Sequence, residues 1–287
     1  MERTIRTRDG LALARRDWPS ADARGTIVIV HGLGEHVGRY AHVAARLNAS
    51  LWSVVGYDQR GHGASPGERG RIAAHDDLLA DLAAVIDDVR AEASGPLVLL
   101  GHSLGGLVVA RFVAGALESP GPPWQRDVDA LVLSSPALDI GMTGAKRAVL
   151  TTLETLTPNL GIGNGLDATG ISRDAAVVAA YRADPLVHDR IAPRLVRFLA
   201  DAGPVVRDLA PRWRVPTLLL YAGSDRLVVP AGSAAFAAAA PAAIVTARPF
   251  ASLFHEIFNE PEQNEVLSVL TAWLDTLNRT PTTRSPR

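Results

Sequence analysis

The stretch Gly101-His102-Ser103-Leu104-Gly105 decides the fold of this chain. An apolar run of β-forming residues, 97–100, leads into it, and a helix-compatible run, 107–116, follows it. A G-x-S-x-G sequence between a strand and a helix is typical of a nucleophile elbow, a sharp turn that exposes a serine hydroxyl at the edge of a sheet. The glycines suit this turn because a Cβ at their positions would collide with the tightly packed strand and helix. The motif therefore predicts that Ser103 makes and breaks acyl bonds.

Short runs of β-forming residues alternate with longer helical patterns on both sides of this motif. Several of the β-forming runs are apolar without alternation, as in strands that are buried on both faces. The pattern predicts an α/β fold, the α/β-hydrolase fold, with a mostly parallel central sheet and helices on both faces. The expected strands are residues 26–30, 53–57, 97–100, 130–133, 217–221 and 244–247. The expected helices are residues 41–47, 78–93, 107–117 and 262–277.

One region breaks this alternation. The chain shows no convincing strand between Ser135 and Arg212, and a structureless loop of that length is rare inside a compact domain. We therefore expect residues 138–210 to form a helical cap over the carboxyl edge of the sheet, where ligands of open α/β sheets bind. The hydrolase core then comprises residues 1–137 and 211–278. The polar, proline-broken tail 279–287 is expected to be disordered.

The composition of the 287-residue chain narrows its function and location. A formal net charge of −1 gives no reason to expect nucleic acid as a partner. The absence of cysteine excludes disulfides, thiol catalysis and thiolate metal sites. Residues 1–18 carry charges throughout and do not resemble a Sec signal, and no window reaches the ~20 apolar residues of a transmembrane helix. We expect a cytoplasmic location, with loose attachment to a membrane surface as the alternative, and the sequence indicates no oligomeric state.

A serine hydroxyl becomes a strong nucleophile only when an oriented base removes its proton. In elbow-containing folds the acid and then the histidine follow the serine along the chain. His255 is the expected base because it lies in a loop after the last expected strand. Asp225 is the expected acid because it follows strand 217–221 closely and can orient the histidine. Asp139, shortly after strand 130–133, is the alternative acid.

Acyl transfer also needs hydrogen-bond donors aimed at the negative oxygen of the transition state. One of them is the backbone N–H of the residue that follows the nucleophile, here Leu104. The other belongs to the loop after an early strand. That loop follows strand 26–30, and the N–H of Leu33 is the expected second donor.

With these residues placed, the chain resembles the monoacylglycerol lipases of the α/β-hydrolase superfamily, within the group of serine aminopeptidase-like (S33) or lysophospholipase-like hydrolases. The resemblance runs from about residue 26 to 277. Its segments are HGLGEH (31–36), GRY (38–40), DQRGHG (58–63), GHSLGG (101–106), SSPA (134–137), DPL (184–186), GSDR (223–226) and HEIFNE (255–260). The first and last blocks together are much more specific than the elbow, which many hydrolases share.

The resemblance implies the same triad and oxyanion hole that the residues themselves indicate. These are Ser103, Asp225 and His255 for the triad, and the backbone N–H groups of Leu33 and Leu104 for the oxyanion hole. It also implies that Glu35, Arg39 and Tyr181 lie near the polar head of the substrate, where they can bind glycerol hydroxyls. In this family no metal or organic cofactor is needed. The expected reaction is hydrolysis of a monoacylglycerol to glycerol and a fatty acid through an acyl-enzyme.

Two other functions remain open at this point. The same machinery can act on lysophospholipids, small esters or N-terminal peptides. Alternatively, a non-catalytic hydrolase fold can bind a small apolar ligand, although such proteins usually lack a member of the triad. Within the cap, an amphipathic segment is expected to line the acyl tunnel and to contact a lipid surface. Its apolar residues are Val149, Leu150, Leu153, Leu156 and Leu160, flanked by Lys146 and Arg147.

Overall fold

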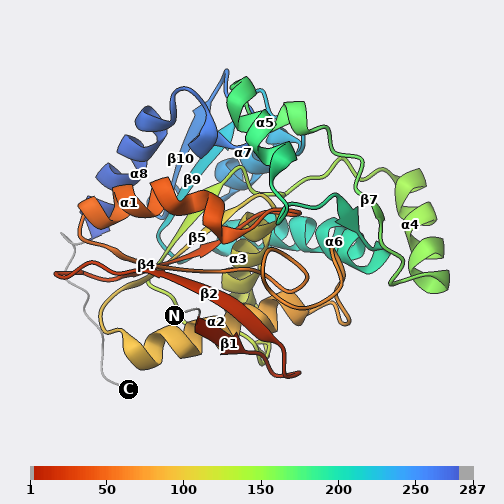
Figure 1. Ribbon diagram of the computed structural model, residues 1–287, viewed down its shortest axis with the longest axis horizontal. Helices are drawn as coiled ribbons and strands as arrows, with labels where there is room; N and C mark the ends of the chain where they lie inside the picture. Colours follow the sequence, from red (N-terminus) through yellow and green to blue (C-terminus); the bar gives the residue numbers. More distant parts are fainter. Residues whose placement is uncertain (1–2, 278–287) are drawn as a thin grey trace.

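The computed structural model describes residues 3–277, so the expected disordered tail, 279–287, lies outside the described residues. Its centre is an 8-stranded sheet with the order β1-β2-β4-β3-β5-β6-β9-β10 (Figure 1). The strands are β1 (Arg3–Arg6), β2 (Ala12–Trp18), β3 (Thr26–Val30), β4 (Ser53–Tyr57), β5 (Leu97–His102), β6 (Ala130–Ser134), β9 (Thr217–Ala222) and β10 (Val245–Phe250). Every neighbouring pair from β4 to β10 is parallel, whereas β2 is antiparallel to β4 and β1 to β2. The prediction of a mostly parallel sheet is confirmed.

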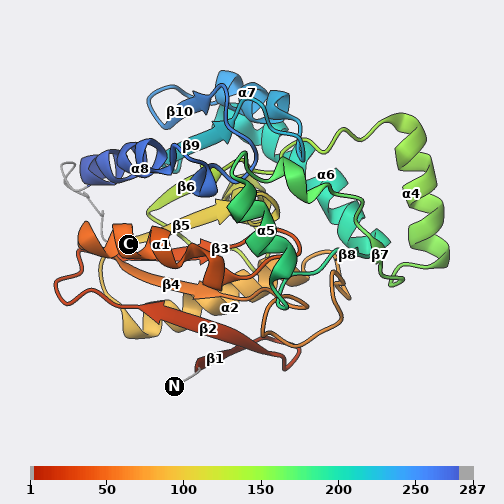
Figure 2. The same ribbon diagram turned by 45° about the horizontal axis from the view of Figure 1, so that its top comes forward.

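Helices cover both faces of this sheet (Figure 2). Successive side chains of a strand point to opposite faces. In β3, Ile27 belongs to the core cluster that contains α1 and α8, while Val28 belongs to the cluster that contains α2, α3 and α7. Strands buried on both faces therefore read as continuous apolar runs. The helices of the described residues are α1 (Ala41–Ala49), α2 (Asp77–Glu92), α3 (Leu104–Ala114), α4 (Gly144–Leu156), α5 (Ala175–Ala183), α6 (Pro193–Leu209), α7 (Pro230–Ala239) and α8 (Gln263–Leu277).

The edge formed by β1 and β2 was not expected from the sequence. These strands are antiparallel and lie outside the parallel part of the sheet. In β1 only Ile5 is buried, and in β2 the buried residues are Leu13 and Arg15. A buried arginine and few apolar positions leave a weak strand signal, because edge strands with one solvated face lack the continuous apolar run of central strands.

The chain between β6 and β9 contains α4, α5 and α6 together with the short strands β7 (Ile162–Gly163) and β8 (Arg190–Ile191). Two residues per strand are too few for a sequence pattern, which is why no strand was expected here. In both views α4 lies at the outer end of the molecule, away from the sheet (Figures 1 and 2). By contrast, α6 packs against α3, and its Leu195, Phe198 and Val206 belong to the same core cluster. Among residues 3–277, no helix combines the length and the apolar character that crossing a membrane requires.

Candidate active site

Ser103 occupies the turn between β5 and α3, at the carboxyl end of a central strand. Its φ of 53° is positive, a conformation that costs a non-glycine residue about 1–3 kcal/mol. The turn is possible because its glycines carry no side chain. A Cβ on Gly101 would lie 2.4 Å from the carbonyl oxygen of Gly105, and a Cβ on Gly105 would lie 2.1 Å from that of Val30. The strained elbow expected from the sequence is therefore present.

The loops that follow β9 and β10 bring Asp225 and His255 together. Nδ1 of His255 lies 2.7 Å from Oδ2 of Asp225, while Oδ1 accepts hydrogen bonds from the N–H groups of Leu227 and Val228 at 2.8 and 3.0 Å. Burial acts to raise the pKa of the Asp225 carboxyl, but His255 and the two N–H groups outweigh it and hold the pKa below its ordinary value. An ionised carboxylate only accepts hydrogen bonds, so Nδ1 carries the hydrogen and Nε2 is left to act as a base.

Asp139, the alternative acid, is engaged elsewhere. Its Oδ1 accepts a hydrogen bond from the N–H of Gly141 at 2.8 Å, and its carbonyl oxygen accepts one from Val229 at 2.9 Å. Within residues 3–277 it shares no hydrogen bond or ion pair with His255. The structure thus brings Asp225, and not Asp139, to the histidine.

A cavity of about 760 Å³ at this edge of the sheet contains both Ser103 and His255 in its wall. His102 also lines it, and the centres of the His102 and His255 rings are 4.8 Å apart. No hydrogen bond joins the Ser103 hydroxyl to His255 within the described part of the chain, and such contacts often shorten only when substrate binds. The cavity is of the size that small-molecule ligands occupy. Its apolar residues include Leu33, Leu104, Ala137, Ile140, Ile171, Val196, Leu199, Leu227 and Val228.

The loop after β3 passes directly beside the elbow. A Cβ on Gly32 would lie 3.2 Å from Cβ of Ser103. Both polar groups of Gly32 are held: its N–H donates to Oε1 of Glu35 at 2.6 Å, and its carbonyl oxygen lies 2.8 Å from Nδ1 of His31. These bonds fix the backbone just before Leu33.

Leu33 and Leu104, the expected oxyanion donors, both line the cavity that contains Ser103. Within residues 3–277 neither backbone N–H donates to a protein acceptor. Leu104 is the first residue of α3, where the helix leaves its N–H groups unpaired and its dipole favours negative charge. Both groups are therefore free to bind an anionic oxygen.

The sequence model of the family described as serine aminopeptidase, S33, matches residues 21–262. The chain belongs to this family. A monoacylglycerol lipase of Mycolicibacterium smegmatis is 38% identical over 267 residues, which cover 89% of this chain and 90% of the relative. The crystal structure of the Paleococcus ferrophilus monoacylglycerol lipase, 34% identical, superposes with a TM-score of 0.81 over 92% of this chain and 99% of that one. The phospholipase YtpA of Bacillus subtilis is 29% identical over 90% of this chain and 98% of its own length.

Two of the three residues expected near the substrate head line the cavity of this S33 hydrolase. They are Glu35 and Tyr181. Arg39 lies behind them: Nη1 is 2.7 Å from Oε2 of Glu35, and Cζ is 4.8 Å from the centre of the Tyr181 ring. Burial acts to raise the pKa of Glu35, but Arg39 and the neighbouring histidines lower it to about 2, so this carboxylate is ionised at neutral pH.

Glu256 was not identified from the sequence as part of the site. Its two carboxylate oxygens accept hydrogen bonds from Arg39 at 2.7 and 2.6 Å, and Oε2 accepts another from Asn259 at 2.8 Å. Arg39 and Glu256 lie in separate sequence blocks, GRY and HEIFNE, both of which carry the family resemblance. A single sequence does not show that these blocks pair. The only signal was an acidic residue directly after the expected base.

The segment after α5 in this S33 protein docks on the loop that carries Leu33. The N–H of His188 donates to the carbonyl oxygen of Gly34 at 2.8 Å, and Nε2 of His36 lies 2.9 Å from Oδ2 of Asp184. Gly34 has a φ of +78°, and a Cβ there would lie 2.3 Å from the carbonyl oxygen of His188. Glycine is therefore needed at this contact.

Proposed function

We propose that this protein is a serine hydrolase that cleaves the ester bond of monoacylglycerols to glycerol and a fatty acid. The observation that carries the proposal is the 2.7 Å contact between His255 and Asp225 at a cavity that Ser103 also lines. Membership of the S33 family and the two monoacylglycerol lipases at 38% and 34% identity support the ester class and the substrate.

In the proposed reaction, Nε2 of His255 removes the hydroxyl proton of Ser103 as Oγ attacks the ester carbonyl carbon. The carbonyl oxygen becomes an oxyanion, which accepts hydrogen bonds from the N–H groups of Leu33 and Leu104. Asp225 holds Nδ1–H and stabilises the imidazolium. The tetrahedral intermediate then collapses, and the imidazolium gives its proton to the glycerol oxygen, which leaves. Water repeats the sequence on the acyl-enzyme and releases the fatty acid.

The lining of the cavity suggests how a monoacylglycerol would lie. Ile140, Val196 and Leu199 offer an apolar wall for an acyl chain. Glu35 and Tyr181 offer polar groups on the side of the loop that carries Leu33, and we propose that they meet the glycerol hydroxyls while Arg39 holds them in place.

We also propose that residues 138–210 act as a cap and that α4 contacts lipid surfaces. Its apolar side chains are unusually exposed: Val149 is 59%, Leu153 40% and Leu156 73% exposed. Leu150 is buried and attaches the helix to the rest of the chain. None of the apolar residues of this segment lines the cavity of the described residues, so the expectation that it lines the acyl tunnel is wrong. An exposed apolar face on α4 would instead bring the enzyme to the interface where a poorly soluble substrate resides.

A lysophospholipase is the second candidate, and the observation that favours it is the presence of Arg69, Arg182 and Arg190 in the cavity wall. Arg182 and Arg190 each face a carboxylate, Asp167 at 3.8 Å and Asp189 at 3.3 Å. The charges of these two arginines are thereby partly neutralised, which favours a substrate with an uncharged head group.

An aminopeptidase would require a carboxylate free to bind an α-ammonium group. The charge of Glu35, the candidate for that role, is already compensated by Arg39, and its oxygens also accept hydrogen bonds from Gly32 and Tyr40. A neutral glycerol hydroxyl needs no uncompensated charge, whereas an α-ammonium group does.

The experiment that tests the proposal compares hydrolysis of monoolein, lysophosphatidylcholine and an aminoacyl anilide by the wild type and by Ser103→Ala. We expect monoolein to be the fastest substrate and Ser103→Ala to be folded and nearly inactive. Faster cleavage of lysophosphatidylcholine would select the second candidate. Undiminished turnover by Ser103→Ala, or a wild type that no fluorophosphonate probe labels, would refute the serine mechanism.

A further inference from the structure

A buried guanidinium joins two loops of the active site. Arg39 lies in the short 3-10 turn Val37–Tyr40 that precedes α1. Its Nη1 donates to Oε2 of Glu35 at 2.7 Å, and Nη1 and Nη2 donate to the two carboxylate oxygens of Glu256 at 2.7 and 2.6 Å. The carboxylate side chains are only 4% and 6% exposed. All three charges therefore share a region with little water.

Each of these carboxylates is linked to a residue that neighbours a group used in the proposed reaction. Oε1 of Glu35 accepts the N–H of Gly32 at 2.6 Å, directly before the oxyanion donor Leu33. Glu256 directly follows His255, the proposed base. A displacement of the guanidinium would consequently move the oxyanion donor and the base relative to each other.

We propose that Arg39 is a positioning residue for acyl transfer: through its simultaneous bonds to Glu35 and Glu256 it fixes the separation of the Leu33 loop and the His255 loop. This role differs from the direct contact with glycerol hydroxyls that the family resemblance implies. It rests on the proposed function, because it concerns the same serine, but it is independent of which ester is the substrate.

The charge balance of the cluster favours this role over a purely stabilising one. Two carboxylates around one guanidinium leave an excess negative charge in a buried place, and the desolvation of three charges is a large cost that an apolar cluster would avoid. Unlike an apolar side chain, a guanidinium fixes the orientation of its partner, because its planar fork binds a carboxylate through two parallel hydrogen bonds. The centre of the Tyr181 ring lies 4.8 Å from Cζ, so this ring also restricts the guanidinium.

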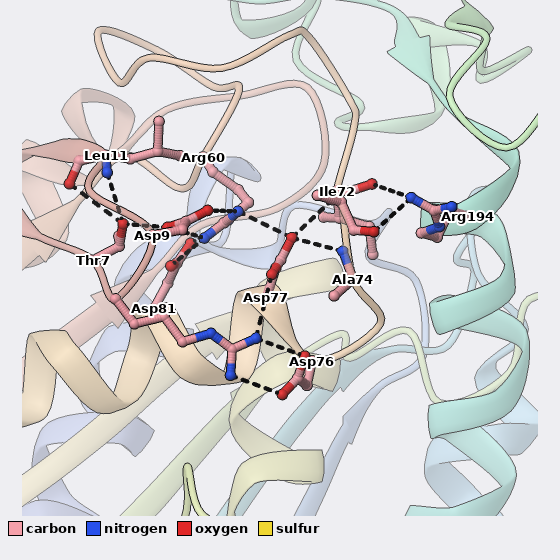
Figure 3. A network of polar contacts seen from close by, with 12 residues as sticks. Thr7, Asp9, Leu11, Arg60, Ile72, Ala74, Asp76, Asp77, Asp81 and Arg194 are labelled. Atoms are coloured by element: carbon pink, nitrogen blue, oxygen red, sulfur yellow. Dashed lines mark hydrogen bonds and ion pairs between the residues drawn. The ribbon is translucent and has the colours of Figure 1, made fainter.

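The chain offers a matched control pair, Arg60 and Asp81. Nε and Nη2 of Arg60 donate to the two oxygens of Asp81, each at 2.6 Å, and the side chains are 5% and 2% exposed. Figure 3 shows this guanidinium among Asp9, Asp77 and Asp81. Neither member of the control pair lines the cavity within the described residues. The pair therefore has the chemistry of the Arg39–Glu256 contact without a connection to the reacting groups.

The test compares Glu256→Gln with Asp81→Asn, each in the full chain, by the rate at which a fluorophosphonate labels Ser103 and by kcat and KM on a p-nitrophenyl ester. We expect Glu256→Gln to label Ser103 roughly 10- to 100-fold more slowly and to lose kcat by the same factor, because small displacements of reacting groups cost about this much. Glu256 also lines the cavity, but both of its carboxylate oxygens are held by Arg39 and Asn259. We therefore expect KM to change by less than about threefold. Asp81→Asn should lower the melting temperature and leave the labelling rate unchanged.

Two further variants separate a positioning role from a structural one. Arg39→Lys keeps the charge but not the fork, and we expect its labelling rate to lie between those of the wild type and Glu256→Gln. The double variant Arg39→Lys/Glu256→Gln should lose no more than about the larger of the two single losses, because both residues act as a unit.

Several outcomes would overturn the inference. One is a Glu256→Gln protein that melts at a lower temperature but labels at the wild-type rate. Another is a raised KM with unchanged kcat, the signature of direct substrate binding. Fully additive losses in the double variant would show that Arg39 does not act through Glu256. A wild type that no fluorophosphonate labels would instead refute the proposed function, and the inference with it.

Discussion

Nδ1 of His255 lies 2.7 Å from Oδ2 of Asp225, although 30 residues separate them along the chain. The fold accounts for this contact. Each residue follows the carboxyl end of its strand, and because β9 and β10 are adjacent and parallel, their loops emerge side by side. The other oxygen of Asp225 is held by two backbone N–H groups, which leaves the carboxylate a single orientation toward the imidazole.

Asp225→Asn tests this contact directly. An asparagine offers Nδ1 an amide in place of a carboxylate, which favours the tautomer that leaves no base facing Ser103. We expect kcat to fall by up to about 10⁴-fold with little change in fold, measured as steady-state hydrolysis of a p-nitrophenyl ester. Asp139→Asn, the alternative acid of the sequence, is the control and should retain most of the activity. Near-normal turnover by Asp225→Asn would contradict the proposed triad.

The lowered pKa of Asp225 also predicts a pH dependence of stability. Because the carboxyl is more acidic in the folded protein than its ordinary value of 3.8, it contributes stability above that pH. The contribution is lost as pH falls through the folded pKa. The melting temperatures of wild type and Asp225→Asn should therefore differ at pH 7 and converge on acidification below about pH 4. A difference that stays constant from pH 7 to pH 2 would be inconsistent with this coupling.

The sequence predicts the parallel part of the fold because each central strand carries its own signal. Residues 26–30 and 53–57 form strands with the expected ends, and the strand expected at 97–100 continues to His102. The β1–β2 edge and α7 were missed. The edge buries an arginine among few apolar residues, and α7 is an alanine-rich run without a clear apolar stripe. Local pattern fails where burial depends on partners that are distant in sequence.

In the candidate site, too, the sequence identifies the residues that lie in local motifs and misses a contact between distant segments. Ser103 and the nearby Leu104 follow from one motif because the elbow is local. The choice of Asp225 over Asp139 followed from strand position, and the structure places the former at the histidine. The bond between Arg39 and Glu256 spans 217 residues. No spacing or periodicity records such a pairing.

Gly105→Ala tests the packing that shapes the elbow. A glycine-to-alanine change inside a helix ordinarily stabilises by roughly 0.5–1 kcal/mol. Here the added Cβ would lie 2.1 Å from the carbonyl oxygen of Val30 and 2.4 Å from that of His31, and backbone atoms of a central strand have no room to retreat. We expect the free energy of unfolding in urea to fall by about 3 kcal/mol or more.

The control for this substitution is Gly144→Ala at the start of α4, where an added Cβ meets nothing within 4 Å. Its stability should be unchanged or slightly raised. Equal stabilities of Gly105→Ala and Gly144→Ala would show that the strand and the helix at the elbow can separate without cost.

The exposed face of α4 predicts a difference between dispersed and dissolved substrates. Leu156→Gln combined with Val149→Gln removes two apolar side chains that are 73% and 59% exposed, so the melting temperature should change little. Each apolar side chain that enters the lipid contributes roughly 1.5–3 kcal/mol. We therefore expect binding to phosphatidylglycerol-containing vesicles to weaken at least about tenfold. Hydrolysis of dispersed monoolein should fall with it, while hydrolysis of soluble p-nitrophenyl butyrate is unchanged.

The control is Leu51→Gln, which replaces an apolar residue that is 50% exposed in the turn between α1 and β4. If the α4 variant and the Leu51 variant bind vesicles as tightly as the wild type, α4 does not contact the membrane.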